Sequence, residues 1–170
     1  MIETIKRNYL EIFSTIDFSE VNKPSKNYNV KIIDPPDFQL NKFFYKQVGK
    51  NHHWLDRLLW SEKQWINYIN NPDLKTYILF DKNNLAGYFE QIFHLNQKNC
   101  EIAYFGIMKQ FYGKKYGGYL LTEAIKKSFE KDIEKVWVHT CSFDHKNALK
   151  NYISRGMKIY KTESINLEIN

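Results

Sequence analysis

The clearest hydrophobic pattern in the chain spans residues 101–129 and changes its period in the middle. Apolar and aromatic residues fill Ile102–Met108 in the manner of a strand. After Gly118 the apolar positions recur at helical spacing, from Leu120 to Phe129. A short basic loop that begins at Gly113 separates the two periods. The pattern therefore predicts a strand, a glycine-bearing loop and an amphipathic helix.

The same reading assigns elements to the rest of the chain. Gly49 and Gly156 end two helices, and Ser61 is an N-cap. The expected strands are Tyr9–Phe13, Asn29–Ile33, Thr76–Phe80, Leu85–His94, Cys100–Met108, Val136–Cys141 and one or two strands within Met157–Ile169. The expected helices are Phe38–Val48, Glu62–Asn70, Gly117–Lys131 and Lys146–Arg155.

The order of these elements predicts the fold class, which is α+β with a mixed sheet. Three strands from residue 76 to residue 108 follow one another with short turns, so they form an antiparallel meander. Strands Cys100–Met108 and Val136–Cys141 are joined through a helix and should be parallel neighbours. Ligands of such sheets bind at the carboxyl ends of the strands, which is where the glycine loop stands.

Composition narrows the class of protein. The 170 residues, 43% hydrophobic and 16% aromatic, suit a single domain over residues 1–170 with one large core. The chain has no apolar run long enough for a membrane span and no secretory pattern, and Cys100 and Cys141 read as reduced, buried thiols. We therefore expect a cytoplasmic protein that does not act at a membrane.

A formal net charge of +6 favours anionic partners. The lysines are spread along the chain, with modest concentrations in 109–115 and 126–135. A basic, aromatic nucleic-acid binder would need these residues clustered on one motif, so nucleic acid is not an expected partner.

The glycine loop is the best candidate for a binding site. A loop that ends at a helix N-terminus leaves backbone N–H groups unpaired, and these groups and the helix dipole suit a phosphate or pyrophosphate. The alternative is that the segment is an ordinary strand-to-helix turn without a binding role. The candidate residues are Gly113, Lys114, Lys115, Tyr116, Gly117 and Gly118.

This order of elements, with the loop in this place, resembles the GNAT superfamily of acetyl-CoA-dependent N-acetyltransferases, over roughly residues 30–161. The segments WLDRLLW, AGYFE and EIAYFG resemble an uncharacterised bacterial subgroup. The family phosphate motif, Gln/Arg-x-x-Gly-x-Gly/Ala, falls on residues 112–117. Gly117 matches it, whereas Tyr112 and Lys115 depart from it. A second motif, Asn-x-x-Ala-x-x-x-Tyr-x-x-x-Gly-Phe, falls on His145, Ala148, Tyr152, Gly156 and Met157, with Asn147 close to the replaced asparagine.

The resemblance implies a GNAT-like acyl-CoA N-acyltransferase fold. In that fold a mixed, largely antiparallel sheet has a V-shaped split between two parallel strands and is flanked by helices. It implies acetyl-CoA as cosubstrate, a primary amine of a small molecule or peptide as acceptor, and no metal. Many members form homodimers. Residues 1–27 would be an N-terminal extension or strand arm. The alternative is a non-catalytic domain of the same fold that binds or senses acyl-CoA.

The departure at Lys115 has two interpretations. If the position requires a positive φ, a lysine costs roughly 1 kcal/mol there. If the residue is already helical, the cost is small and its ammonium can lie over a phosphate. We favour the helical conformation.

The resemblance also supplies catalytic candidates. The general base of the histone acetyltransferase branch lies fourteen positions before the first motif glycine, and Glu101 lies fourteen before Lys115. Glu90, the single acid in GYFEQ, is the alternative, and both carboxylates also fit solvated strand positions. For the acid, Tyr152 matches the position of the tyrosine that often faces the thioester sulfur in this family, although packing alone would also explain it. The backbone N–H near Ile107 and Met108 would polarise the thioester carbonyl.

Other polar and aromatic side chains carry weaker signals. His139 could relay protons or be a satisfied core histidine. His52, His53 and His94 show no metal-ligand spacing. Aromatic residues that could line the acceptor cleft, or simply pack on the sheet, are Phe43, Phe44, Tyr45, His53 and Trp54.

Overall fold

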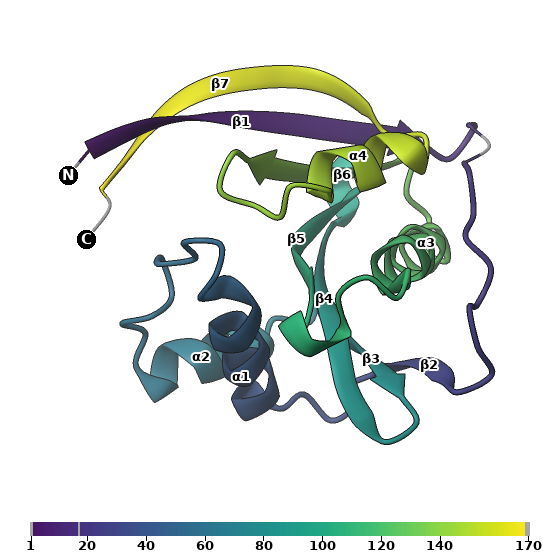
Figure 1. The fold of residues 1–170 in the computed structure, drawn as a ribbon, viewed down its shortest axis with the longest axis horizontal. Coiled ribbons are helices and arrows are strands. Elements are labelled where there is room, and N and C mark those ends of the chain that lie inside the picture. The colour runs from purple at the N-terminus through teal and green to yellow at the C-terminus, as the bar shows by residue number, and fades with distance from the viewer. Residues whose placement is uncertain (1, 17, 169–170) are drawn as a thin grey trace.

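Seven strands form one sheet that carries helices on both faces (Figure 1). The structure is a computed structural model that describes residues 2–16 and 18–168. Its strands are β1 Ile2–Phe13, β2 Tyr28–Ile32, β3 Leu74–Asp81, β4 Asn84–His94, β5 Asn99–Ile107, β6 Lys135–Cys141 and β7 Lys158–Glu168. Its α-helices are α1 Phe38–Gly49, α2 Glu62–Ile69, α3 Tyr116–Phe129 and α4 Ala148–Ser154, with short 3₁₀ turns at Leu95–Gln97 and Lys109–Phe111.

The strand order is β2-β3-β4-β5-β6-β1-β7. Strands β3, β4 and β5 form the predicted antiparallel meander, and β5 and β6 are the predicted parallel pair. Every other described strand pair is antiparallel. The predicted α+β class with a mixed, largely antiparallel sheet is therefore confirmed.

The parallel pair is short, and this splits the sheet. Pairing between β5 and β6 runs from Asn99↔Lys135 to Glu101↔Trp137, and the two strands diverge beyond it. A β-bulge lies at the start of the divergence, because Glu90 of β4 faces Tyr104 whereas the next residue faces Ile102. Bulges bend a strand and are common beside active sites. The V-shaped split implied by the sequence resemblance is thus present.

The two faces of the sheet carry different helices. Alternate residues of β4 point to opposite faces, as the pleat requires. Tyr88 stacks on Phe44 of α1 with ring centroids 4.8 Å apart, whereas Gln91 donates to the Ala124 carbonyl of α3 at 2.9 Å. Helices α1 and α2 therefore cover one face and α3 and α4 the other (Figure 1).

Several element boundaries differ from prediction. β1 starts at Ile2 rather than Tyr9, because β6 and β7 pair with it on its two sides and order a charged segment with no clear alternation. β7 is one long strand, and the predicted end at Ile169 lies outside the described residues. α4 is shorter than predicted and begins at Ala148. The predicted N-cap at Ser61 is confirmed by a capping box with Gln64.

None of the helices in the described part of the chain is long and apolar enough to cross a membrane.

The helical conformation expected for Lys115 is wrong. Lys115 is the N-cap of α3 and adopts a left-handed conformation, with φ +62° and ψ +15°. The chain must reverse direction between β5 and α3 within a few residues, and Gly113 also has a positive φ of +79° there. A Cβ in this region costs about 1 kcal/mol, so Lys115 is strained in the folded state.

Replacing Lys115 by glycine should therefore stabilise the protein. We expect Lys115→Gly to raise the free energy of unfolding by about 0.5–1 kcal/mol, because relief of the left-handed strain exceeds the entropy that glycine adds to the unfolded chain. Urea denaturation measures this change. Lys114→Gly is the matched control, since Lys114 is not among the residues with positive φ. Equal effects of the two substitutions would contradict the assignment of strain to Lys115.

Candidate active site

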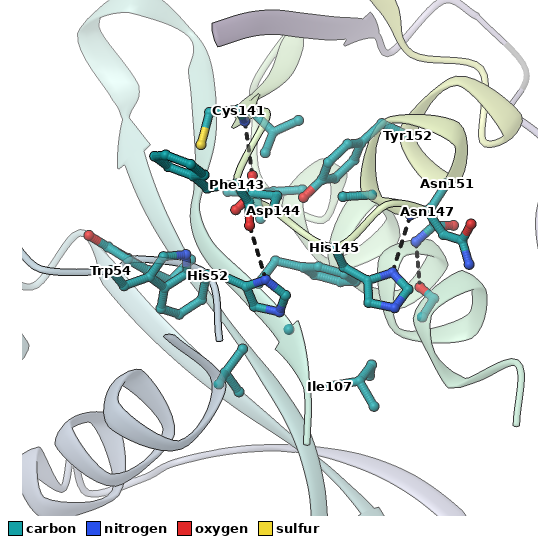
Figure 2. A pocket seen from close by; sticks show the side chains of 18 of the residues that line it. His52, Trp54, Ile107, Cys141, Phe143, Asp144, His145, Asn147, Asn151 and Tyr152 are labelled. Atoms are coloured by element: carbon teal, nitrogen blue, oxygen red, sulfur yellow. Dashed lines mark hydrogen bonds between the residues drawn. The ribbon is translucent and has the colours of Figure 1, made fainter. Parts of the chain in front are cut away.

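A cavity of about 1070 Å³ opens where β5 and β6 diverge (Figure 2). Its walls come from β5, β6, α4, the end of α1, the start of α3 and the loops at 52–56, 111–115 and 143–147. Arg7 of β1 and two residues at the end of β7 also line it. Figure 2 shows Trp54 and Phe143 at one end, and Asn147 and Asn151 at the other. The predicted residues that line it are Ile107, Gly113, Lys115, Tyr116, Gly117, Gly118, Asn147 and Tyr152.

The start of α3 forms the loop end of the cavity. The N-cap Lys115 makes no side-chain capping bond, and the first N–H groups of a helix have no partner within it. A Cβ on Gly118 would lie 2.7 Å from Nη1 of Arg155 and 3.0 Å from Cγ2 of Val21, so a larger residue here would require the arginine side chain to move. A Cβ on Gly117 would meet only ordinary contact, with Nδ2 of Asn151 at 3.5 Å. The loop therefore offers backbone donors that an anion can approach closely.

Two predicted loop residues lie outside the cavity lining. Lys114 extends over the ring of Phe111, with its Nζ 5.5 Å from the ring centroid. Met108 is buried, and its N–H donates to the Ala86 carbonyl at 2.8 Å. The proposed use of the Met108 amide as a donor to the thioester is therefore incorrect, because β4 already occupies it.

The amide of Ile107 is the better donor. Successive residues of a strand point their N–H groups toward opposite edges. Since Met108 donates toward β4, the N–H of Ile107 points away from β4, toward the side on which β6 has diverged. This N–H therefore faces the cavity that Ile107 lines.

Sequence reasoning missed two residues that line the loop end, Asn151 of α4 and its C-cap Arg155. Asn151 donates from Nδ2 to the Gly117 carbonyl at 3.0 Å, which ties α4 to the start of α3. Arg155 lies beside Gly118 and brings a guanidinium to the same end of the cavity. Asn151 follows Asn147 by four residues, so helical spacing places both on one face of the helix. That spacing was the signal that could have revealed Asn151.

Tyr152 lies between the two ends of the cavity. Its ring packs near Phe105 at a centroid distance of 6.2 Å, and its hydroxyl points toward the middle of the cavity (Figure 2). Burial, with a smaller effect from the charge of Asp144, raises the pKa of Tyr152 above its ordinary value. Tyr152 is therefore protonated at neutral pH.

Glu101 lies at the vertex of the split, at the last pair of the β5–β6 ladder. It is not among the residues that line the cavity, although its neighbour Ile102 is. Its Oε2 lies 3.5 Å from Nε2 of His94. Burial raises the pKa of Glu101, and the contact with His94 opposes that change. Glu101 can therefore accept a proton, but it would reach the cavity through water.

Glu90 lies in a buried hydrogen-bond network and not in the cavity. Its side chain is fully buried and is not among the cavity residues. Its carboxylate accepts from Arg57 at 3.0 Å, from Tyr68 at 2.6 Å and from Asn41 at 2.8 Å. These partners join α1, α2 and the loop between them to β4. The structure therefore does not bring Glu90 together with Tyr152 and the loop.

The predicted aromatic lining is present in part. His53 and Trp54 line the cavity. Phe44 and Tyr45 are fully buried beneath it, and Phe43 is exposed elsewhere. Helical periodicity within α1 explains this division, because its buried face packs on the sheet.

Two further histidines, His139 and His52, lie at the cavity. His139 lines the cavity, and burial followed by the charge of Arg7 lowers its pKa, so it is neutral at pH 7. His52 also lines the cavity, with Nδ1 3.2 Å from the Phe143 carbonyl and Nε2 3.2 Å from the Tyr112 hydroxyl. Within residues 2–16 and 18–168, no group of three or more metal-binding side chains is arranged to hold a metal ion.

Comparison with solved structures finds proteins of the same fold. An N-acetyltransferase related to GCN5 from Sphaerobacter thermophilus has a TM-score of 0.73 at 11% identity, and the match covers 96% of this chain and 50% of that one. A similar protein from Kribbella flavida has a TM-score of 0.67 at 11% identity, over 97% of this chain and 58% of that one. This chain thus spans half of the first protein's length and 58% of the second's.

A shorter protein also matches. An aminoglycoside acetyltransferase from an uncultured soil metagenomic sample has a TM-score of 0.65 at 14% identity, over 79% of this chain and 90% of that one. No curated protein sequence matches the chain. The model of the acetyltransferase (GNAT) family matches residues 38–157, which include the split, the loop and α4. The chain therefore belongs to the GNAT family of acetyltransferases.

Proposed function

We propose that this protein transfers an acetyl group from acetyl-CoA to a primary amine of a small molecule or peptide. Membership in the GNAT family supports acyl transfer in general. Acetyl-CoA as the donor is supported by one observation. The same cavity contains the start of α3, with its backbone amides, and Tyr152. An anionic cofactor anchored at the amides would place its thioester beside the tyrosine.

The cofactor would lie along the split. Its diphosphate binds the backbone amides at 113–118, and Lys115 and Arg155 supply positive charge there. The pantetheine arm runs beside the free edge of β5, in the gap that β6 leaves. The N–H of Ile107 then donates to the thioester oxygen as negative charge develops on it.

The chemistry is a direct displacement. The amine nitrogen forms a bond to the acetyl carbon, and the bond from that carbon to sulfur breaks. The thiolate takes the proton of the Tyr152 hydroxyl. The amine gives its own proton to Glu101 through water. No covalent enzyme intermediate is required.

The state of the two cysteines agrees with the expected compartment. Cys100 and Cys141 are both free in the structure. Free thiols are typical of reducing compartments, which supports a location in the cytoplasm.

Acetyl-CoA should stabilise the protein through the glycine loop. We expect saturating acetyl-CoA to raise the melting temperature by roughly 5–10 °C, as ligand near 100 times its dissociation constant does in a protein of this size. Gly117→Val should abolish this shift, because its branched side chain blocks approach to the amides. The melting temperature without ligand checks that the variant folds. A wild-type protein that shows no shift would refute cofactor binding.

Tyr152 should affect turnover more than binding. Tyr152→Phe removes the proton donor and keeps the ring, so kcat should fall by about 100-fold while the acetyl-CoA thermal shift stays unchanged. Release of free thiol with a panel of amines measures kcat. Tyr119→Phe is the control, since Tyr119 is a buried α3 tyrosine outside the cavity lining. Binding of acetyl-CoA without thiol release from any amine would instead favour a sensing domain.

Glu101 should control the pH dependence. A carboxylate with a raised pKa acts as a base only above that pKa, so kcat/KM should rise with pH through the pKa of Glu101. Glu101→Gln should remove this rise and lower kcat/KM by about 100-fold. Glu130→Gln, at the exposed end of α3, is the control. An unchanged pH profile in Glu101→Gln would exclude Glu101 as the base.

A further inference from the structure

Asp56 is a carboxylate that the structure holds in place at the end of the cavity opposite the loop. It stands between α1 and α2 and lines the cavity. One oxygen, Oδ1, accepts a hydrogen bond from the Tyr45 hydroxyl at 2.6 Å, and the other, Oδ2, accepts one from the Tyr104 hydroxyl at 2.6 Å. A helix and a strand thus fix the orientation of a side chain on a loop.

The surroundings of Tyr45 and Tyr104 keep both hydroxyl groups protonated. The Tyr45 hydroxyl accepts the backbone N–H of Arg57 at 3.0 Å, which leaves its own proton for Asp56. Burial, together with the bonds to Asp56, raises the pKa of Tyr45 well above its ordinary value, and burial also raises that of Tyr104. Both hydroxyls are therefore neutral at neutral pH, and each donates its proton to a carboxylate oxygen of Asp56.

No cation of the described residues lies within ion-pair distance of this carboxylate, although Arg7 lines the same cavity. The nearby guanidinium of Arg57 is buried against the rings of Tyr68 and Tyr104 and makes its ion pair with Glu90 at 3.0 Å. His139 is uncharged at neutral pH, and Asp56 has no ion-pair partner among residues 2–16 and 18–168.

The exposed carboxylate still has acceptor capacity. A carboxylate offers about four lone-pair positions, and the two tyrosines use two of them. The remaining positions can receive the N–H donors of a ligand.

Aromatic side chains line the cavity around this carboxylate. Trp54 packs edge-on against Tyr104, with ring centroids 4.8 Å apart. Phe143 stacks on His53 at 4.5 Å, and all four residues line the cavity. Aromatic faces attract ammonium groups and also pack on apolar carbon chains. The end of the cavity that contains Asp56 therefore suits a cation joined to an apolar body.

We propose that Asp56 binds a second, non-reacting ammonium group of the acceptor, so that the acceptor is a diamine or a related dication. This inference rests on the proposed acetyl transfer. The amine that attacks the thioester must be uncharged, whereas a carboxylate stabilises the protonated form of an ammonium in contact with it. The group held by Asp56 is therefore not the nucleophile, and its role is to position the other end of the molecule.

Calorimetry of acceptor binding tests this directly. The protein saturated with CoA is titrated with straight-chain diamines of four to eight carbons and with the monoamines of equal length. We expect the best diamine to bind about 10- to 100-fold more tightly than its monoamine, which is the contribution of a charged hydrogen bond. Asp56→Asn should remove this preference.

Glu163→Gln is the matched control, because Glu163 also accepts a tyrosine hydroxyl, from Tyr9 at 2.9 Å, but does not line the cavity. It should keep the preference for diamines. Asp56→Glu provides a second test if Asp56→Asn fails to bind acetyl-CoA. Its longer side chain should shift the preferred diamine to a shorter length, and an unchanged length preference would overturn the proposal.

The outcomes separate this inference from the proposed function. Equal affinity of the wild-type protein for diamines and monoamines overturns the role of Asp56, even if both amines release CoA from acetyl-CoA. An equal loss of both affinities in Asp56→Asn also overturns it. Diamine binding that depends on Asp56 supports it, even if no amine releases CoA and the transferase proposal fails.

Discussion

The divergence of β5 from β6 after three residue pairs is the constraint on which the rest of this molecule depends. Backbone N–H and C=O groups inside a sheet normally pair with the next strand, and leaving them unpaired is costly. Here the edge of β5 that faces β6 has no strand partner beyond the third pair, although its other edge stays paired with β4. The resulting gap provides main-chain donors and space for an extended ligand, which can complete the interrupted ladder.

The two faces of the sheet give the gap two chemically different ends. On one side, α3 and α4 bring backbone amides and the side chains of Asn151 and Arg155, which suit an anion. On the other side, α1 and the loop after it bring aromatic rings and Asp56, which suit a cation with an apolar body. The opening between β5 and β6 is the route by which groups bound on the two faces can meet.

A buried ion pair fixes the end that contains Asp56. Arg57 and Glu90 are almost fully enclosed, and Tyr68 and Asn41 complete the hydrogen bonds of the carboxylate. Removing one partner of such a pair typically costs about 3–5 kcal/mol, because the other charge is left buried. The network holds α1, α2 and their loop against β4, and it thereby determines where Asp56, the residue before Arg57, can stand. Glu90 contributes to the site through this rigidity.

The sequence by itself determined the order of elements, the parallel pair and the glycine loop, because these follow from local periodicity, caps and connection lengths. It also singled out Tyr152, because a motif fixes its spacing from Gly156. The left-handed conformation of Lys115, the occupied amide of Met108 and the length of β1 follow from chain closure and strand pairing, which local patterns do not encode. The tertiary structure alone decided that Asp56 faces the cavity while Glu90 is buried. Both are acids with aromatic neighbours in the sequence. Only their packing distinguishes them, since α1 and α2 enclose Glu90 whereas α1 and β5 hold Asp56 at the cavity.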